Sequence, residues 1–469
     1  MRQKPRDDAS SAMPDRIALW QQLQCVADVV AQVRSGTSAQ VALATAPVAL
    51  RAGVQAIVFD VLRALGRAQA LRTLLVPRPP APAVDALLCA ALALLSEPGE
   101  PRYDAFTLVN QSVEAAKRSP RQRALATFIN ACLRRFLREK DALLQAIAND
   151  PVARWNHPLW WIERLKVDHP QHWQAMLQFN NMRAPMTLRV HARQSTPADY
   201  LAQLLALGMQ ASLRGAHGIA LARPVPVTDL PGFAQGIVSV QDAAAQLAAP
   251  LLLGEPVRFD SRIPTASGHP EASGVRNASP LRVLDACAAP GGKTAHLLEL
   301  ADHQVTALEI DPVRAERLVQ TLARVGVQAQ LVVADAAQPE RWWDGQLFDA
   351  ILLDAPCTAS GIVRRHPDVR WLRRESDIAQ LAQLQARLLR TMWGLLKPGG
   401  RLLYCTCSVF LAEGQRQVET FLAHNTGARL LPSPGHLLPD FSAKASAVPD
   451  NQMRDHDGFF YALLEKNTT

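Results

Sequence analysis

The stretch Leu284-Asp285-Ala286-Cys287-Ala288-Ala289-Pro290-Gly291-Gly292-Lys293-Thr294 joins a predicted strand at 282–287 to a predicted helix at 293–301. Small residues and glycines let the backbone approach a ligand closely, and the free amides at the start of a helix bind anionic or polar groups. The spacing matches neither the Gly-x-Gly-x-x-Gly dinucleotide fingerprint nor the P-loop. The loop therefore predicts a ligand site of another kind within an α/β domain.

The residues after this loop alternate between strand and helix patterns. Apolar runs predict further strands at 305–310, 330–335, 348–354 and 401–408, with helices at 312–325 and 377–396 between them. Near-continuous apolar strands separated by helices indicate a parallel sheet that is covered on both faces. A stretch rich in Ser, Gly, Pro and Ala interrupts this domain, and we expect residues 256–280 to form a mobile surface insertion.

Acidic residues end three successive predicted strands. Glu309 ends the second strand, about twenty residues beyond the loop, where a carboxylate can accept both hydroxyls of a ribose. Asp335 and Asp354 end the third and fourth strands, around the crevice in which α/β sheets bind ligands. Each acid alone would more often be a helix cap or a solvated turn. Together with a loop that lacks the dinucleotide glycines, they predict that the cofactor is S-adenosylmethionine.

Two cysteines follow adjacent strands of the predicted sheet. Asp354-Ala355-Pro356-Cys357 follows the fourth strand, and Thr406-Cys407-Ser408 follows the fifth, so both thiols should face one crevice. Carbon 5 of cytosine is a poor nucleophile, and a thiolate that adds to carbon 6 activates it for methylation. A base must then remove the carbon 5 proton, so two thiols can divide the work. Buried structural cysteines and a redox pair are alternatives; zinc is disfavoured because the cysteines lack paired Cys-x-x-Cys spacing. Cys405 is interpreted as a packing residue.

Length, composition and charge set the broad class of protein. The chain has 469 residues, of which 48% are hydrophobic and 20% charged, which predicts two to four globular domains. Seven irregularly spaced cysteines and the lack of a signal or an apolar span predict a cytoplasmic protein without a disulfide framework. The net charge is +6 over residues 1–150, +4 over 151–235 and −2 over 236–469. The basic first half favours a polyanionic partner, with a solvated basic surface as the alternative.

The composition divides the chain into segments. We predict a flexible leader at 1–15, a helical domain at 16–150, a small α+β domain at 151–235 and the ligand-binding domain at 236–469. Helical periodicity covers 17–33, 54–75, 84–95 and 125–144. The tryptophans of the second domain, Trp155, Trp160, Trp161 and Trp173, are expected to be core residues rather than a platform for stacking bases.

Several motifs carry a family resemblance. The Ala-Ala-Pro-Gly-Gly-Lys-Thr loop, the Asp354–Cys357 segment and Thr406-Cys407-Ser408 resemble the RNA 5-methylcytosine methyltransferases of the Nol1/Nop2/Sun group. Residues 361–368 (GIVRRHPD) and 457–461 (DGFFY) resemble the bacterial 16S ribosomal RNA enzymes within that group. Residues 128–136 (FINACLRRF) resemble the last helix of their NusB-like RNA-binding domain. The resemblance implies an all-α NusB-like N-terminal domain, a small α+β middle domain and a Rossmann-like class I methyltransferase domain.

The resemblance also implies roles for individual residues. Cys407 corresponds to the family's nucleophile, and Cys357 to the cysteine that assists product release, although DNA cytosine-5 methyltransferases use the Pro-Cys cysteine as nucleophile. Asp354 would lie between the cofactor and the target base, contact both and orient the cytosine, and Asp335 would meet the adenine of the cofactor. Glu309 would hold the ribose, where an aspartate is commoner in the family. The implied cofactor loop consists of Cys287, Ala288, Ala289, Pro290, Gly291, Gly292 and Lys293.

Arginines near the crevice are candidate phosphate contacts. Residues Arg364, Arg365, Arg370, Arg373 and Arg374 follow the Cys357 loop, and contacts from such residues would position an RNA. Arg183 and Arg189 resemble a family segment that lines the RNA groove. The alternative for the first group is an ion-paired start of a helix. His191 stands where the family usually has asparagine.

The sequence therefore predicts a monomeric enzyme that methylates carbon 5 of a cytosine in small-subunit ribosomal RNA before subunit assembly. S-adenosylmethionine is the expected cofactor, with no metal and no membrane association. One alternative is a transfer-RNA or other ribosomal 5-methylcytosine methyltransferase. Another is a non-catalytic RNA-binding assembly factor that kept the fold, against which the intact cysteines, Asp354 and the glycine loop argue.

Overall fold

The computed structural model of the chain describes residues 17–254, 280–439 and 455–468. The leader predicted at 1–15 and nearly all of the insertion predicted at 256–280 lie outside the described residues. The chain forms two compact units. Unit 1 contains residues up to Leu159 together with His366–Leu372, and unit 2 contains Trp160–Arg365 and Arg373–Thr469. No described helix combines the length and hydropathy that crossing a membrane demands.

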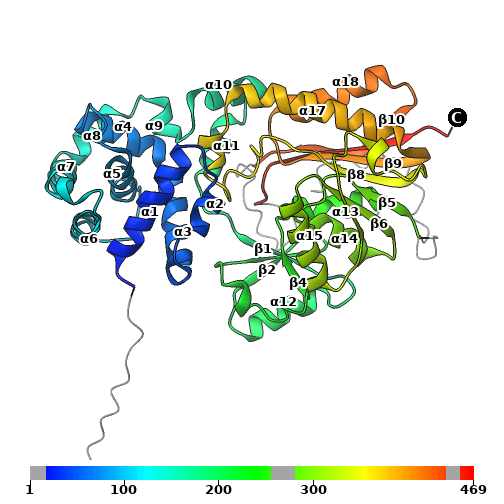
Figure 1. Cartoon of the computed structure of the whole chain (residues 1–469), viewed down its shortest axis with the longest axis horizontal. Coiled ribbons are helices and arrows are strands. Elements are labelled where there is room, and N and C mark those ends of the chain that lie inside the picture. The colour runs from blue at the N-terminus through cyan, green and yellow to red at the C-terminus, as the bar shows by residue number, and fades with distance from the viewer. Residues whose placement is uncertain (1–16, 255–279, 440–454, 469) are drawn as a thin grey trace, which may run out of the picture. The chain divides into compact units, whose positions relative to one another are not determined.

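Unit 1 is built from helices, and its described residues contain no strand (Figure 1). The predicted helix at 54–75 is two helices, because the backbone leaves helical geometry at Ala64. The predicted helix at 125–144 is likewise divided, at Glu139. Its helices are α1 (Leu19–Arg34), α2 (Ala39–Ala44), α3 (Val48–Arg63), α4 (Leu65–Leu75), α5 (Pro82–Leu95), α6 (Ala105–Arg118), α7 (Ala126–Arg138), α8 (Lys140–Ala146), α9 (Pro151–Trp155) and α16 (Val369–Leu372), with a 3-10 turn at Arg123–Leu125.

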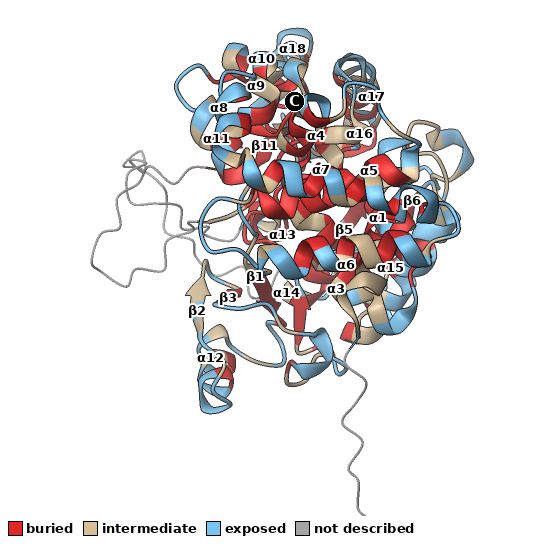
Figure 2. Ribbon diagram, turned by 90° about the vertical axis from the view of Figure 1, so that its left-hand side faces the viewer, coloured by how far each residue is buried: buried red, intermediate tan, exposed pale blue. Residues whose placement is uncertain are grey.

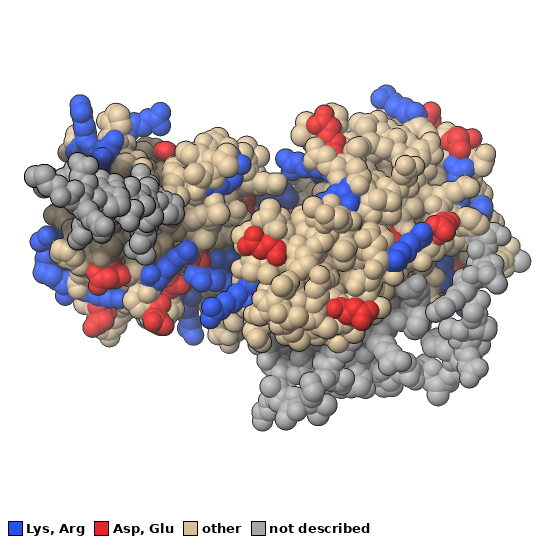
Figure 3. All heavy atoms as spheres, turned by 90° about the horizontal axis from the view of Figure 1, so that it is seen from below, with Lys and Arg blue, Asp and Glu red and all other residues tan. Residues whose placement is uncertain are grey.

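Helix α7 has a buried side and an exposed side, as Figure 2 shows. Ile129, Leu133 and Phe136 are buried, whereas Arg134 and Arg135 are exposed. Arg135 forms an i,i+4 ion pair with Glu139, and Arg134 donates to Asn130. Figure 3 shows Lys and Arg side chains interspersed with Asp and Glu side chains on the visible face. The burial pattern of α7 is that of an amphipathic helix with a solvated basic side.

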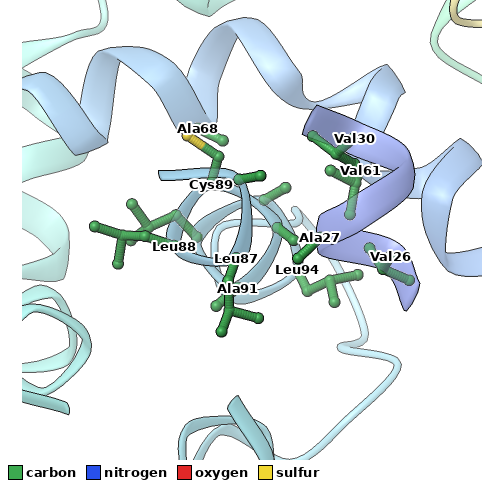
Figure 4. Packing of buried hydrophobic residues seen from close by; sticks show 14 of the residues in the cluster. Val26, Ala27, Val30, Val61, Ala68, Leu87, Leu88, Cys89, Ala91 and Leu94 are labelled. Atoms are coloured by element: carbon green, nitrogen blue, oxygen red, sulfur yellow. The ribbon is translucent and has the colours of Figure 1, made fainter. Parts of the chain in front are cut away.

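The core of unit 1 surrounds α5. Every residue of α5 from Val84 to Leu95 is buried and all but Asp85, which pairs with Arg34 and Arg72, are apolar, so this helix lies in the middle of the bundle. In Figure 4, Leu87, Leu88 and Leu94 of α5 point in different directions, with residues of α1, α3 and α4 around them. Pro82 at the first helical turn explains why the helix begins there.

Unit 2 contains a small antiparallel sheet, which fits the predicted α+β character of this region. The sheet has the order β2-β3-β1-β4, and its buried face packs against α12. Trp161, a predicted core residue, is fully buried beside Trp160 and Phe410. The elements are α10 (Leu159–Asp168), α11 (Trp173–Asn180), β1 (Met186–Val190), α12 (Pro197–Ala206), β2 (Ala211–Arg214), β3 (Gly218–Leu221) and β4 (Val238–Val240), with a 3-10 turn at Val227–Asp229.

A seven-stranded sheet forms the centre of unit 2, in the order β10-β11-β9-β8-β5-β6-β7. The five strands from β9 to β7 are parallel, as predicted, whereas β10 and β11 add antiparallel pairs that the sequence reasoning did not anticipate. The strands are β5 (Arg282–Asp285), β6 (Gln304–Glu309), β7 (Gln330–Val333), β8 (Phe348–Asp354), β9 (Leu396–Thr406), β10 (Ala428–Leu437) and β11 (Phe459–Lys466).

Helices cover both faces of this sheet (Figure 1). Alternate residues of each strand face opposite layers: Leu353 and Tyr404 pack with α17 and α18, whereas Leu352 and Cys405 pack with α13 and α14. Cys405 is fully buried, in agreement with its interpretation as a packing residue. The helices are α13 (Ala248–Leu253), α14 (Gly292–Leu300), α15 (Pro312–Val325), α17 (Glu375–Gly394) and α18 (Gln415–His424), and 3-10 turns occur at Ala245–Leu247, Pro339–Arg341 and Leu411–Glu413.

Candidate active site

The two predicted thiols meet at the carboxyl edge of the large sheet. β8 and β9 are adjacent and parallel, so the loops that leave their carboxyl ends start side by side. The Sγ atoms of Cys357 and Cys407 are 3.4 Å apart, within hydrogen-bond distance for sulfur. Both cysteines are partly exposed. The pair can therefore act together on a group that enters from solvent.

The environment of Cys357 favours its neutral thiol form. The hydrogen bond with Cys407, the burial of the sulfur and the nearby carboxylate of Glu413 together raise the pKa of Cys357 well above its usual value of 9.0. A thiol that stays protonated can donate to a neighbouring sulfur. A neutral thiol at Cys357 is compatible with a role other than that of the attacking nucleophile.

A cation lies between the cofactor loop and the thiols. Lys293 Nζ, at the start of α14, donates to Asp354 Oδ2 over 2.6 Å, and the Lys293 side chain is 14% exposed. Burial opposes the charge of Lys293, but the carboxylate of Asp354 outweighs that effect and raises the pKa of the ammonium group. Cys405 Sγ is 3.5 Å from Asp354 Oδ1. Asp354, at the end of β8, is thereby held in one orientation.

The predicted cofactor loop is tied to the strand beside it. Ala288 N donates to Leu308 O of β6, and Gly291 N donates to Ala288 O. Gly291 has a φ of +98°, a conformation that favours glycine, where the loop turns into α14. As at any helix start, the first amides of α14 have no partner within the helix.

Glu309 ends β6 and is almost completely buried. One carboxylate oxygen accepts from Ala289 N over 3.3 Å, and the other accepts from Asp311 N and Arg314 Nη1. The carboxylate thus fastens the cofactor loop to β6. Since each oxygen has two acceptor positions, capacity remains for a ligand hydroxyl.

The other strand-end acids differ in their positions. Asp335 lies two residues beyond the end of β7, because this strand stops at Val333, and it accepts from Ala337 N and Gln338 Nε2. Asp285, which the sequence reasoning did not select, ends β5 and accepts from Thr294 Oγ1 over 2.7 Å. Burial raises the pKa of Asp285 to about 7.

Arg189 does not have the exposed position expected of a phosphate contact. Its side chain is 1% exposed and forms a bidentate ion pair with Glu299 of α14. It also donates to Gly292 O at the start of α14 and to Gln241 Oε1. The expectation that it contacts RNA is wrong for this conformation, because its donors are directed at protein groups.

The arginines after the Cys357 loop also bind protein. Arg364 is buried, donates to Arg183 O and lies over the ring of Phe179. Arg365 bridges Asp242 and Asp457. Arg370 is fully buried within unit 1 and donates to Asn156 O, and burial lowers its pKa to about 9. The phosphate-contact expectation is therefore corrected for Arg364 and Arg370, and Arg365 is largely occupied by its two carboxylates.

Arg183 has an exposed side chain. The four arginines described above are not exposed: Arg189, Arg364, Arg365 and Arg370. Arg373 was also expected to face RNA, but its guanidinium group donates to Thr358 O and Cys357 O. Arg373 thus stabilises the backbone of the Cys357 loop. An ion-paired or hydrogen-bonded framework thus describes most of this arginine group better than a phosphate-binding surface.

Two glycines join the motifs that the sequence placed far apart. Gly361 N donates to Cys407 O, and Gly458 N donates to Gly361 O, both over 2.9 Å. A Cβ atom on Gly361 would lie 1.9 Å from Gly458 O. Backbone contacts therefore join the Cys357 loop, the Cys407 loop and the start of β11. A side chain would not fit at these contacts, which explains the glycines of the 361–368 and 457–461 motifs.

A buried carboxylate near the thiols was missed by the sequence reasoning. Glu413, in the 3-10 turn after the Cys407 loop, is fully buried and accepts from Thr358 and Ser408. Its only sequence signal is its position six residues after Cys407. Among the described residues no group of His, Cys, Asp or Glu has an arrangement that could hold a metal ion.

Comparisons with known proteins find relatives over most of the chain. A family model described as 16S rRNA methyltransferase RsmB/F matches residues 276–465, and a ferredoxin-like domain model of the same family matches 157–228. Ribosomal RNA small subunit methyltransferase B of Vibrio cholerae is 39% identical over 423 residues, covering 88% of this chain and 89% of that protein. The Klebsiella pneumoniae protein of the same name is 39% identical over 426 residues, with 89% and 90% covered.

Solved structures show the same fold. The crystal structure of PH0851 has a TM-score of 0.72 at 24% identity and covers 97% of this chain and 99% of that one. A methyltransferase homologue from Pyrococcus horikoshii has a TM-score of 0.53 at 26% identity, covering 68% of this chain and 98% of its own.

Proposed function

The chain belongs to the RsmB/F family of 16S rRNA methyltransferases, and from this premise we propose that it methylates carbon 5 of a cytosine in 16S rRNA. In the proposed reaction Cys407 bonds covalently to carbon 6 of the base, and Cys357 assists release of the product. The observation that carries the proposal is the 3.4 Å contact between the Sγ atoms of two partly exposed cysteines that follow adjacent parallel strands.

S-adenosylmethionine is the proposed methyl donor, and the residues around the crevice fit it. A carboxylate can accept from a ribose hydroxyl, and Glu309 at the end of β6 has one acceptor position left beside its bonds from Ala289 N, Asp311 N and Arg314 Nη1. The amides at the start of α14 suit the methionine carboxylate, and Asp335 beyond β7 suits the adenine amino group. When bound, the cofactor supplies an electrophilic methyl group.

The chain's own residues supply the activation of the base. The Cys407 thiolate adds to carbon 6, which makes carbon 5 nucleophilic. Asp354, held by Lys293, would orient the cytosine through its ring nitrogen and amino group. Loss of the carbon 5 proton then allows Cys407 to leave, and Cys357 is the base proposed for that proton. Because Cys357 is favoured as the neutral thiol, it would pass its own proton to the departing Cys407 sulfur as it takes up the carbon 5 proton.

The target base must leave its stack, because a thiolate approaches carbon 6 from above the ring. We therefore propose that the substrate is 16S rRNA before subunit assembly, when the target hairpin is accessible. Arg183 remains a proposed contact to RNA phosphate, since its side chain is exposed.

The experiment is a methyl-transfer assay with protein-free 16S rRNA, assembled small subunits and transfer RNA, followed by nucleoside mass spectrometry. We expect 5-methylcytidine in the protein-free 16S rRNA, and none with Cys407→Ser protein. Equal or greater methylation of transfer RNA would favour the transfer-RNA alternative. Absence of methylation and of S-adenosylmethionine binding would favour the assembly-factor alternative.

A further inference from the structure

The carboxylate of Glu413 is near Cys357, and its side-chain hydrogen bonds come from Thr358, Gln385 and Ser408 rather than from either sulfur. It belongs to the short 3-10 turn Leu411–Glu413 that follows the Cys407 loop, and none of its surface is exposed. Keeping a carboxylate in a dry interior is unfavourable unless its acceptor positions are filled. The donors that fill the acceptor positions of Glu413 therefore indicate its structural role.

The donors to Glu413 come from the residue that follows each cysteine. Thr358, next to Cys357, donates its backbone N–H over 2.9 Å to one carboxylate oxygen and its hydroxyl to the other. Ser408, next to Cys407, donates its hydroxyl over 2.6 Å to the same second oxygen. One carboxylate thus binds both thiol-bearing loops directly.

A third element completes the set of donors. Gln385 of α17 donates over 3.1 Å to the first oxygen of Glu413, and the same amide nitrogen donates to Pro356 O just before Cys357. Four donors therefore meet the four acceptor positions of an ionised carboxylate. Tyr404 OH donates to Glu413 O and so holds the turn itself against β9.

The Cys357 loop needs such support because its backbone is not in a relaxed conformation. Ala359, two residues after Cys357, has a φ of +59°, which is unfavourable for a residue with a side chain. Ser360 Oγ meets Ser408 Oγ at 2.9 Å and accepts from Val409 N. These bonds oppose the relaxation of Ala359, which would move the loop away from Cys407.

We propose that Glu413 is a positioning residue that fixes the separation of the Cys357 and Cys407 thiols. This inference rests on the proposed two-thiol function, because only that function requires the sulfurs to stay close. Glu413 acts through Thr358 and Ser408 and takes no part in the bond changes.

The test measures the thiol pair independently of methylation. In glutathione buffers the two thiols transfer two electrons and two protons to glutathione disulfide, forming one Cys357–Cys407 disulfide and two molecules of glutathione. The equilibrium constant reports the effective concentration of one thiol at the other, and peptide mapping identifies the pair among the seven cysteines. Full-length Glu413→Gln and Glu413→Ala proteins are compared, because both lack the charge and only the glutamine can rebuild the hydrogen bonds.

We expect Glu413→Gln to keep the equilibrium constant within about twofold and Glu413→Ala to lower it about tenfold or more. Glu299→Ala, which removes a buried carboxylate paired with Arg189 elsewhere in unit 2, is the matched control and should leave the constant unchanged. Methylation by Glu413→Ala should show a lower kcat with unchanged KM values, and Glu413→Gln should restore kcat. Ser408→Ala removes only the hydrogen bond from Ser408 to Glu413, and it is the second variant should Glu413→Ala not fold.

An equal equilibrium constant in folded Glu413→Ala and Glu413→Gln proteins would overturn the proposal, as would an equal constant in Ser408→Ala and wild-type proteins. Folding is verified by thermal melting and by binding of S-adenosylhomocysteine. Failure of the proposed function has a different signature, since a fully active Cys407→Ala protein would refute the two-thiol reaction while the glutathione equilibrium still reports on Glu413.

Discussion

Replacement of Gly361 by alanine should inactivate the protein, because three backbone segments of the active site meet at this residue. The added Cβ would lie 1.9 Å from Gly458 O, whereas real Cβ contacts are essentially never under 3.0 Å. The Cys357 loop and the Gly458 segment must therefore separate by about 1.1 Å. Neither neighbour can yield by rotating a side chain, since the atoms in contact are backbone atoms.

The size of the effect follows from the bonds that this separation breaks. Gly361 N donates to Cys407 O and Gly458 N donates to Gly361 O, and each bond contributes about 1 kcal/mol. With the strain of overpacking, the free energy of unfolding should fall by about 2–4 kcal/mol. A displacement of about 1 Å at the nucleophile should lower kcat by about 100-fold.

The assay is steady-state methylation of 16S rRNA together with thermal melting. Gly427→Ala is the matched control, because nothing lies within 4 Å of a Cβ atom at that position and its φ is not positive. The control should match the wild-type protein in both measurements. A Gly361→Ala protein with wild-type kcat would refute the idea that the backbone contacts hold Cys407 in place.

Three further predictions follow from single contacts. Burial raises the pKa of Asp285 from its usual 3.8 to about 7, so the folded protein keeps a proton that the unfolded chain loses between these pH values. The free energy of unfolding should therefore fall as the pH rises from about 4 to 7. Urea titrations should show a smaller fall for Asp285→Asn. Lys293→Met leaves the half-buried Asp354 without its ion pair, which should lower both kcat and the free energy of unfolding, the latter by about 1–3 kcal/mol; unchanged values would contradict the contact. Arg183→Ala should weaken RNA binding and reduce its salt dependence, whereas Arg364→Ala should lower the melting temperature because that side chain is buried.

Elements with local end signals could be predicted from the sequence. The helix predicted at 312–325 coincides with α15, since Asp311 caps its first turn, Pro312 begins it and Gly326 ends it in the left-handed conformation. The strand predicted at 348–354 coincides with β8. The two thiols could be placed together because parallel strands end at one edge of a sheet.

Features that depend on distant partners could not be predicted. The sequence shows that Arg189, Arg364 and Arg370 are charged, but burial comes from groups such as Glu299 and Asn156, which are more than one hundred residues away from the arginines they bind. Antiparallel β11 pairs with β9 across a long intervening segment, which no local pattern reports. Glu413 likewise has no local signal, because its function depends on two loops that only the folded chain brings together.

The covalent bond between Cys407 and the target RNA is the central claim, and a denaturing gel tests it most directly. Cys357→Ala and Cys407→Ala proteins are incubated with protein-free 16S rRNA and S-adenosylmethionine and then denatured. The proposed roles predict a protein–RNA adduct that accumulates with Cys357→Ala, which can form the bond but releases product slowly, and no adduct with Cys407→Ala. An adduct that forms only with Cys407→Ala would contradict the account and reverse the roles of the two thiols.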